Sequence, residues 1–148
     1  ERGQRVRLQR IVHAGQRRLP ATRTGGTAVA HNSVGFSDPL ALELDVIGPK
    51  ANPTRGEPVE SGKVLFEDAH IEAGVWECTP GTFPSKREGF REAVTIIKGS
   101  GELRDADGNV TPFTAGTALA IPEGWVGEWD IAETTRKVYV VSYTEPRA

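Results

Sequence analysis

The chain has 148 residues with 18 basic and 20 acidic side chains, which gives a net charge of −2 at neutral pH. A chain of this length fits one domain that buries about 70% of its unfolded surface and needs no cross-link for stability. Cys78 is the only cysteine, which excludes an intrachain disulfide and a cysteine zinc cluster. The sequence has neither an apolar run of about 18 residues nor an apolar N-terminal signal region. We therefore expect a cytoplasmic protein without a membrane partner.

The charge is unevenly distributed along the chain. Residues 1–31 contain seven Arg and one Glu, whereas residues 32–148 contain 11 basic and 19 acidic side chains. This predicts an Arg-rich N-terminal arm, 1–31, and a single-domain body, 32–148. In the arm, Val6 and Leu8 alternate with Arg, which fits a solvated extension or an edge strand docked on a neighbouring subunit. An Arg-rich, acid-poor arm is also typical of a transit peptide.

Clustered Arg side chains in the arm also suit contact with the phosphates of nucleic acid. The arm has no interleaved aromatic residues, however, and the body that follows it is acidic. We therefore do not expect a nucleic-acid partner.

From residue 41 onward the sequence is a series of short runs rich in Val, Ile, Thr and aromatic residues. The expected strands are 41–47, 63–68, 71–79, 92–99, 101–106, 109–113, 117–124, 126–131 and 136–143. Gly, Pro and Asp interrupt the pattern at 48–56, 79–89, 98–101, 105–108, 114–116, 122–124 and 132–135. The stretch 106–109 predicts a hairpin turn, because Gly108 and Asn109 tolerate a positive φ. No window holds a helical period, so the sequence predicts an all-β jelly-roll barrel.

Two spacings carry a family resemblance. Glu92 and Gly99 are set as E-x6-G, and Gly116, Pro122 and Gly124 are set as G-x5-P-x-G. These are the anchors of the two cupin motifs, and the chain resembles small single-domain cupins over about residues 62–143. The resemblance extends to the ureidoglycine aminohydrolase-type and ethanolamine-utilisation-type group, on the blocks GVWECTPGTF, REAVTIIKGSGELRDADGNV, AGTALAIPEGWVGEWDI and TTRKVYVV. It implies a cupin double-stranded β-helix, a jelly-roll barrel with a small-molecule ligand inside, and members of this group do not share one activity.

The resemblance also implies positions for metal-binding His residues, and these positions hold other residues here. They are occupied by Ser85 and Arg87, or by Lys86 and Glu88 in the shorter motif spacing, and by Gly127. Of the usual ligand set only Glu92 remains. The three His residues lie outside both motifs, at His13, His31 and His70. Because a divalent ion needs three or four converging ligands, we predict no metal and no cofactor.

Side chains alternate along a strand, so an inward Glu92 places Val94 and Ile96 inside the barrel as well. The same alternation sends Trp129 inward beyond the Gly124 turn, together with Gly127. The outward set, Ala93, Thr95 and Ile97, is apolar enough to be covered in a homodimer. A carboxyl group among apolar neighbours has its pKa raised towards neutrality, which suits Glu92 to general acid or base catalysis. The alternative is a structural carboxylate held by Arg or Lys.

Further candidates for ligand binding lie on the neighbouring blocks. Trp76 and Trp125 either line the mouth of the barrel or pack in its core. Glu77 is a candidate, but it and Cys78 face opposite ways and parity alone does not say which is inside. Cys78 has no adjacent His, so a nucleophilic thiol is not expected. The remaining polar candidates are Arg136, Lys137 and Tyr139, of which either basic residue is able to neutralise a substrate carboxylate or to pair with Glu92.

These observations predict a metal-independent enzyme of lyase, isomerase, cyclase or hydrolase type, with Glu92 as its general acid or base. Two alternatives remain: a non-catalytic module that binds a small metabolite in the same cavity, and a structural subunit that uses its arm on an acidic partner. A second titratable group within hydrogen-bonding reach of Glu92 favours catalysis. A lone, salt-bridged Glu92 in an apolar cavity favours binding or structure.

Overall fold

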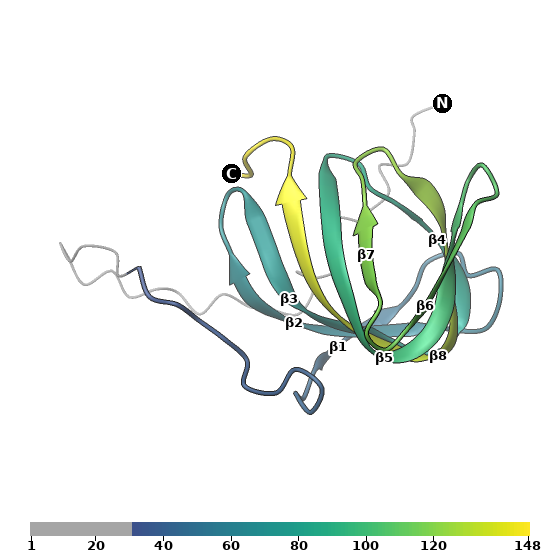
Figure 1. Cartoon of the computed structure of the whole chain (residues 1–148), viewed down its shortest axis with the longest axis horizontal. Helices are drawn as coiled ribbons and strands as arrows, with labels where there is room; N and C mark the ends of the chain where they lie inside the picture. The colour runs from purple at the N-terminus through teal and green to yellow at the C-terminus, as the bar shows by residue number, and fades with distance from the viewer. Residues whose placement is uncertain (1–30) are drawn as a thin grey trace.

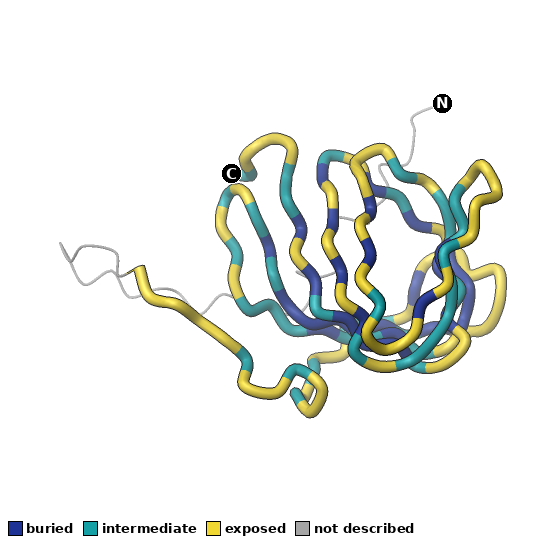
Figure 2. The backbone as a smooth tube through the Cα atoms, in the orientation of Figure 1, coloured by how far each residue is buried: buried dark blue, intermediate teal, exposed yellow. Residues whose placement is uncertain are grey.

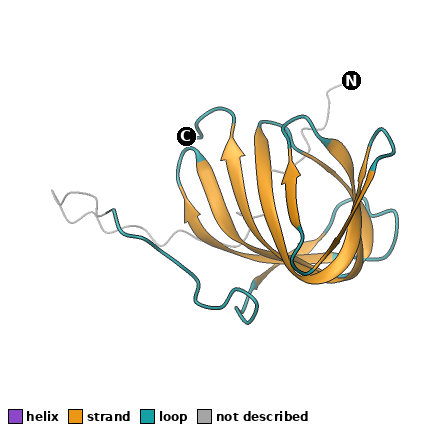
Figure 3. Cartoon of the chain, in the orientation of Figure 1, coloured by secondary structure: helices purple, strands orange, loops and turns teal. Residues whose placement is uncertain are grey.

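The computed structural model describes residues 31–148, so the expected arm lies outside it except for His31. The described part of the chain forms strands and no helix, and hence has no helix long and apolar enough to cross a membrane (Figures 1 and 3). The strands are β1 (Asp45–Pro49), β2 (Val59–Glu67), β3 (Ile71–Cys78), β4 (Gly81–Lys86), β5 (Phe90–Asp105), β6 (Val110–Thr114), β7 (Ala118–Ile121) and β8 (Val126–Tyr143). The expected all-β class is confirmed.

The two longest strands, β5 and β8, form the central pair of the barrel sheet. They pair antiparallel along their whole length, from Phe90 opposite Tyr143 to Asp105 opposite Gly127. The first half of β5 also pairs with β7 and its second half with β6, whereas β8 pairs with β4 near its start and with β3 near its end. β2 and β1 extend the sheet beyond β3. The curved strands enclose the interior of the barrel (Figure 1).

The sequence predicts breaks at 98–101 and 132–135, and this expectation is wrong. β5 and β8 continue through both segments, with register shifts between residues 96 and 101. Gly99 has a φ of +92°, and a Cβ atom added there would lie 2.7 Å from the Cα of Thr135. A glycine-centred irregularity thus lets the strand bend without leaving the sheet.

The segment 79–89, expected to be a loop, contains β4. This strand pairs with β8, and its other side makes only an isolated bridge between Arg55 and Thr82 among the described residues. An edge position tolerates Pro84, which lacks a backbone N–H. Towards the N-terminus, β1 begins at Asp45, four residues later than expected.

Burial along β5 confirms the predicted alternation. Glu92, Val94 and Ile96 are buried, while Ala93 and Thr95 are exposed (Figure 2). The buried side chains join a core of apolar and aromatic residues, in which the Trp129 ring lies 5.7 Å from that of Trp76 and 5.5 Å from that of Phe113.

The hairpin between β5 and β6 is also confirmed. The Gly108 N–H donates to the carbonyl of Asp105 at 2.9 Å, and Gly108 has a φ of +92°. A positive φ at this position suits glycine.

Candidate functional site

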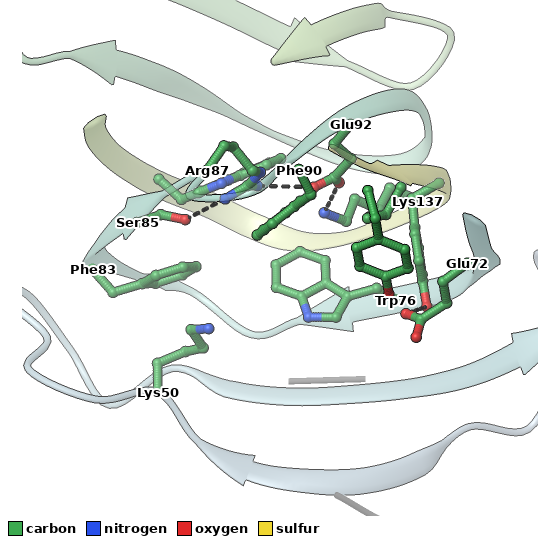
Figure 4. A pocket seen from close by; sticks show the side chains of 13 residues that line it. Lys50, Glu72, Trp76, Phe83, Ser85, Arg87, Phe90, Glu92 and Lys137 are labelled. Atoms are coloured by element: carbon green, nitrogen blue, oxygen red, sulfur yellow. Dashed lines mark hydrogen bonds and ion pairs between the residues drawn. The ribbon is translucent and has the colours of Figure 1, made fainter. Parts of the chain in front are cut away.

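The interior of the barrel contains a cavity of about 70 Å³. Its aromatic lining is Trp76, Phe83, Phe90, Trp129, Tyr139 and Tyr143, and its charged lining is Lys50, Glu72, Arg87, Glu92 and Lys137. Ser85 and Val141 complete the lining. Figure 4 shows the lining side chains converging from β3, β4, β5 and β8 and from the segments that follow β1 and β4. A small cavity with apolar walls and a few convergent polar groups is typical of a site for a small molecule.

Glu92 lies at the centre of the polar groups, between two cations. Its Oε1 accepts a hydrogen bond from the Nζ of Lys137 on β8, and its Oε2 lies 2.9 Å from the Nη2 of Arg87, the residue that follows β4 (Figure 4). The exposed fractions of the three side chains are 4%, 8% and 7%. Arg87 also donates from Nη1 to the Oγ of Ser85 at 2.7 Å. Each oxygen of the carboxylate is therefore paired with a separate positive charge.

The two cations reverse the expected pKa shift of Glu92. Desolvation by burial raises the pKa of this carboxyl, but the charges and hydrogen bonds of Lys137 and Arg87 outweigh it and hold the pKa below its usual value. The expectation of a pKa raised towards neutrality is therefore wrong. Glu92 is ionised at neutral pH, which makes it a candidate base.

Lys137 is held in an aromatic setting. Its Nζ lies 4.6 Å from the ring centre of Trp76, 4.8 Å from that of Trp129 and 5.6 Å from that of Tyr139. Burial lowers the pKa of Lys137 below its ordinary value, and Arg87 lowers it further, although Glu92 opposes both effects. The ammonium group therefore releases its proton more readily than that of an exposed lysine.

A second carboxyl group, Glu72 on β3, also lines the cavity. The hydroxyl of Tyr139 donates to its Oε2 at 3.1 Å. Burial and the negative charge of Glu72 raise the pKa of Tyr139, and the same two causes raise the pKa of Tyr143 to about 12. Both phenols therefore keep their protons at neutral pH.

Lys50 lies after β1, at the wall opposite Arg87 in the close-up view (Figure 4). Its Nζ lies 2.8 Å from the Oε2 of Glu60 and 4.8 Å from the ring centre of Phe83. The indole N–H of Trp76 donates to Oε1 of the same Glu60 at 3.3 Å. Glu60 thus neutralises Lys50 and orients the Trp76 ring.

Five of the predicted site residues come together in this cavity: Trp76, Glu92, Trp129, Lys137 and Tyr139. Val94 and Ile96 point inward as expected, but they belong to the packed core and do not line the cavity. Trp125 is half-buried beside the cavity, where its indole N–H donates to the Oδ1 of Asp105 at 2.6 Å. Its ring centre lies 5.6 Å from the guanidinium of Arg87. Trp125 therefore packs against Arg87, which lines the cavity, but does not line the cavity itself.

Glu77 and Arg136 are not placed at the cavity. The Arg136 Nε donates to the Oε2 of Glu77 at 2.8 Å, on the face of the sheet opposite to that of Trp76 and Lys137. Arg136 Nη1 also donates to the carbonyls of Pro39, Leu40 and Leu42. This pair therefore attaches the segment before β1 to the outer surface. Cys78 is the inward residue, and burial raises the pKa of its thiol to about 12.

Several lining residues were not predicted. Arg87 and Ser85 occupy positions that the family resemblance assigns to metal ligands. Metal ligands point into the barrel, so the polar side chains at these positions could have been predicted to line the cavity. Glu72 shares the face of Trp76 by strand alternation, four residues earlier. No sequence pattern predicts that Lys50 lines the cavity, because only the folded chain brings the loop after β1 to the barrel.

The residues around Glu92 do not fit a divalent ion. Among residues 31–148 no group of three or more His, Cys, Asp or Glu side chains is placed to hold a metal. Arg87 places a positive charge where a metal ligand would be needed. It also donates a hydrogen bond to the Oγ of Ser85, the residue at the other metal-ligand position. A Cβ atom at Gly127 would clash with the carbonyl oxygen of Arg104 and lie 2.6 Å from Trp125, which leaves no room for a side chain.

Comparison with known protein families shows which family the chain belongs to. The model of the EutQ-like cupin domain matches residues 65–139, just over half of the chain. The chain belongs to this cupin family. This confirms the cupin jelly roll that the motif spacings predict, whereas the ureidoglycine aminohydrolase-type relationship stays a prediction.

Solved structures with the cupin fold include a protein of unknown function from Pseudomonas syringae pv. tomato, which is 27% identical with a TM-score of 0.63 over 71% of this chain and 46% of that one. The EutQ protein of Clostridium difficile is 22% identical with a TM-score of 0.52, over 58% and 64%. Ectoine synthase from P. lautus is 19% identical with a TM-score of 0.53, over 57% and 64%. The chain thus spans about half to two thirds of these proteins. No curated protein sequence matches it.

Proposed function

We propose that this cupin binds a small organic metabolite inside its barrel and acts on it without a metal ion, using Glu92 and Lys137 as an acid–base pair. The reaction is of a type that moves protons: a lyase, isomerase, cyclase or hydrolase reaction. The observation that carries the proposal is the buried contact between the carboxylate and the ammonium group at the cavity wall.

Energetics supports a functional reason for this pair. Burying two charges costs several kcal/mol per ion, and apolar residues of similar size often stabilise a core equally well or better. The neighbouring inward residues, Val94 and Ile96, are apolar. A barrel that needed only stability is expected to continue this apolar pattern at positions 92 and 137.

The protonation states support complementary roles. Glu92 is ionised and able to accept a proton from a substrate carbon, nitrogen or water. Lys137 carries a proton that burial makes easier to release. A second titratable group within hydrogen-bonding reach of Glu92 favours catalysis over simple binding.

The second candidate function is metabolite binding without turnover. It is favoured by one observation, namely that both oxygens of Glu92 already interact with cations. Such a carboxylate is held firmly, and taking up a proton would cost it these interactions.

The test is hydrogen exchange and conversion of small metabolites in D₂O, followed by proton NMR after treatment with a metal chelator. We expect one class of metabolite to exchange or convert with the wild type, and Glu92→Gln to slow this by about a hundredfold or more. Glu77→Gln is the matched control, because it makes the same substitution on the outer surface, and it should react like the wild type. Turnover that needs added metal, or that survives in Glu92→Gln, would contradict the proposal.

A further inference from the structure

The amino group of Lys137 is directed into the cavity. Its Nζ lies 4.6 Å from the ring centre of Trp76 and 4.8 Å from that of Trp129, and both rings belong to the cavity lining. Figure 4 shows this nitrogen at the inner end of the side chain, next to Glu92. The side chain keeps 8% of its surface exposed, and because Lys137 lies on the inner face of β8, this surface faces the cavity. A small molecule in the cavity therefore meets the lysine.

Lys137 shares its counter-ion with a second cation. Glu92 pairs through Oε1 with Lys137 and through Oε2 with Arg87, so one negative charge serves two positive charges. A lysine that lies in an apolar pocket beside another cation gives up its proton more easily and becomes a nucleophile. Lys50, the other lysine of the lining, lies 2.8 Å from a different carboxylate, that of Glu60. We therefore expect Lys137 to be the reactive lysine of the cavity.

We propose that Lys137 forms a Schiff base with a small aldehyde or ketone inside the barrel. Glu92 takes a proton from the ammonium group, and the electron pair of the nitrogen then forms a bond to the carbonyl carbon. The bond from this carbon to its oxygen breaks, and the oxygen leaves as water with two of the three ammonium protons, both passed on by Glu92. The products are one water and an iminium ion with a single positive charge. This inference rests on the proposed function, for which it names the substrate class.

The surroundings of Lys137 suit the iminium ion as well as the ammonium ion. Both ions carry one positive charge on the same nitrogen, so the contacts with the rings of Trp76 and Trp129 and with the carboxylate of Glu92 are kept. An iminium ion draws electrons from the neighbouring carbon, which makes the hydrogens on that carbon acidic. Glu92 lies next to this nitrogen and is able to take such a proton. The Schiff base thus gives the proposed base a carbon acid to act on.

The cavity walls limit the size of the carbonyl compound. One water needs about 10–15 Å³ of such volume, so a cavity of about 70 Å³ has room for a molecule of about two to four carbons. Phe83 and Trp129 offer apolar contact for its carbon chain. Propanal, an uncharged aldehyde of three carbons, therefore fits this description and serves as the probe.

The test is reductive trapping of the full chain with propanal and sodium cyanoborohydride, which reduces an iminium ion and leaves a propyl group on its lysine. Peptide mass spectrometry then measures the rate of labelling at each of the five lysines, Lys50, Lys63, Lys86, Lys98 and Lys137. We expect labelling at Lys137 to be at least about tenfold faster than at Lys98, whose side chain is 52% exposed. In protein unfolded with guanidinium, these two lysines should be labelled at similar rates.

Two matched variants check the assignment. Lys137→Met should lose the fast labelling, whereas Lys98→Met, the same substitution at an exposed lysine, should keep it. Labelling of Lys137 that is no faster than that of Lys98, or preferential labelling of Lys50, would overturn the inference. The map of the wild type decides this even if Lys137→Met fails to fold.

The proposed function fails separately from this inference. Fast trapping at Lys137, together with exchange of the α-hydrogens of propanal in D₂O at the same rate in the wild type and Glu92→Gln, would remove the acid–base role and leave the substrate class standing. Exchange of a metabolite that depends on Glu92, without trapping at Lys137, would remove the Schiff base alone.

Discussion

Glu92 of β5 and Lys137 of β8 form an ion pair inside the barrel, with only 4% and 8% of their side chains exposed. Arg87 contacts the other oxygen of the same carboxylate. The three side chains thus form a buried cluster with two positive charges and one negative charge. Removing different members leaves different charges behind, which leads to the first prediction.

Glu92→Gln should destabilise the barrel more than Lys137→Met. The first change leaves two buried cations without a carboxylate, a loss of about 3 kcal/mol or more, whereas the second leaves Glu92 paired with Arg87. Denaturant unfolding of both variants measures the two free energies. A larger loss in Lys137→Met would mean that Arg87 does not neutralise Glu92 in solution.

The acid side of the stability curve should reflect Glu92. Its pKa is lower in the folded state than the ordinary value of 4.5, so the unfolded chain binds more protons below that pH. The stability from this group is fully present above pH 4.5 and is lost as the pH falls towards the folded pKa. Comparing unfolding free energies of the wild type and Glu92→Gln should give a difference that shrinks as the pH decreases through this range. A constant difference would show that the pKa of Glu92 is not lowered.

The purified protein should contain no stoichiometric transition metal. Arg87 occupies a position that a metal ligand would need, and Gly127 has no room for a side chain, so Glu92 alone is left to compete with water for the ion. Elemental analysis checks this. One equivalent of zinc, iron, manganese or nickel that resists dialysis would contradict the expectation.

The outer face of the sheet should pair with a second copy of the chain. Phe66, Ala73, Val140, Ala93 and Ala120 lie side by side in register across β2, β3, β8, β5 and β7. Phe66 and Val140 are 42% and 41% exposed, which leaves apolar surface for a partner to cover. Sedimentation should give a dimer for the wild type and a monomer for Val140→Glu. Val110→Glu, an equally exposed valine on β6, is the control that should stay dimeric.

Strand alternation predicted the core of the site, because a buried face imposes a period of two. Glu92 and Trp129 were therefore placed correctly, together with the hairpin at 106–109. Parity alone did not distinguish Glu77 from Cys78, since apolar residues occur on both faces of β3 and the outer face is itself partly covered. The segment before β1 covers part of the outer face, where Arg136 donates to the carbonyl of Pro39. These two residues lie almost a hundred positions apart, so no local pattern predicts their contact.

The sequence pattern also failed to predict that β5 and β8 continue through residues 98–101 and 132–135, because this too depends on long-range contacts. Gly99 lies in a segment whose composition is that of a turn, and only the close approach of Thr135 shows that the glycine serves a bend within a strand. The lowered pKa of Glu92 was likewise missed, because it depends on where the ends of Arg87 and Lys137 meet. Long-range side-chain contacts of this kind leave no periodic pattern in the sequence.

The central claim is that the buried Glu92–Lys137 pair exists for chemistry and not for stability. The most direct measurement is the double variant Glu92→Leu with Lys137→Met, with unfolding free energy and metabolite exchange in D₂O determined on the same sample. We predict a folded barrel more stable than Glu92→Gln, because the lysine charge is gone and apolar side chains replace the pair, together with loss of exchange by about a hundredfold or more. A double variant that keeps the exchange rate of the wild type, or that is less stable than Glu92→Gln, would contradict the account.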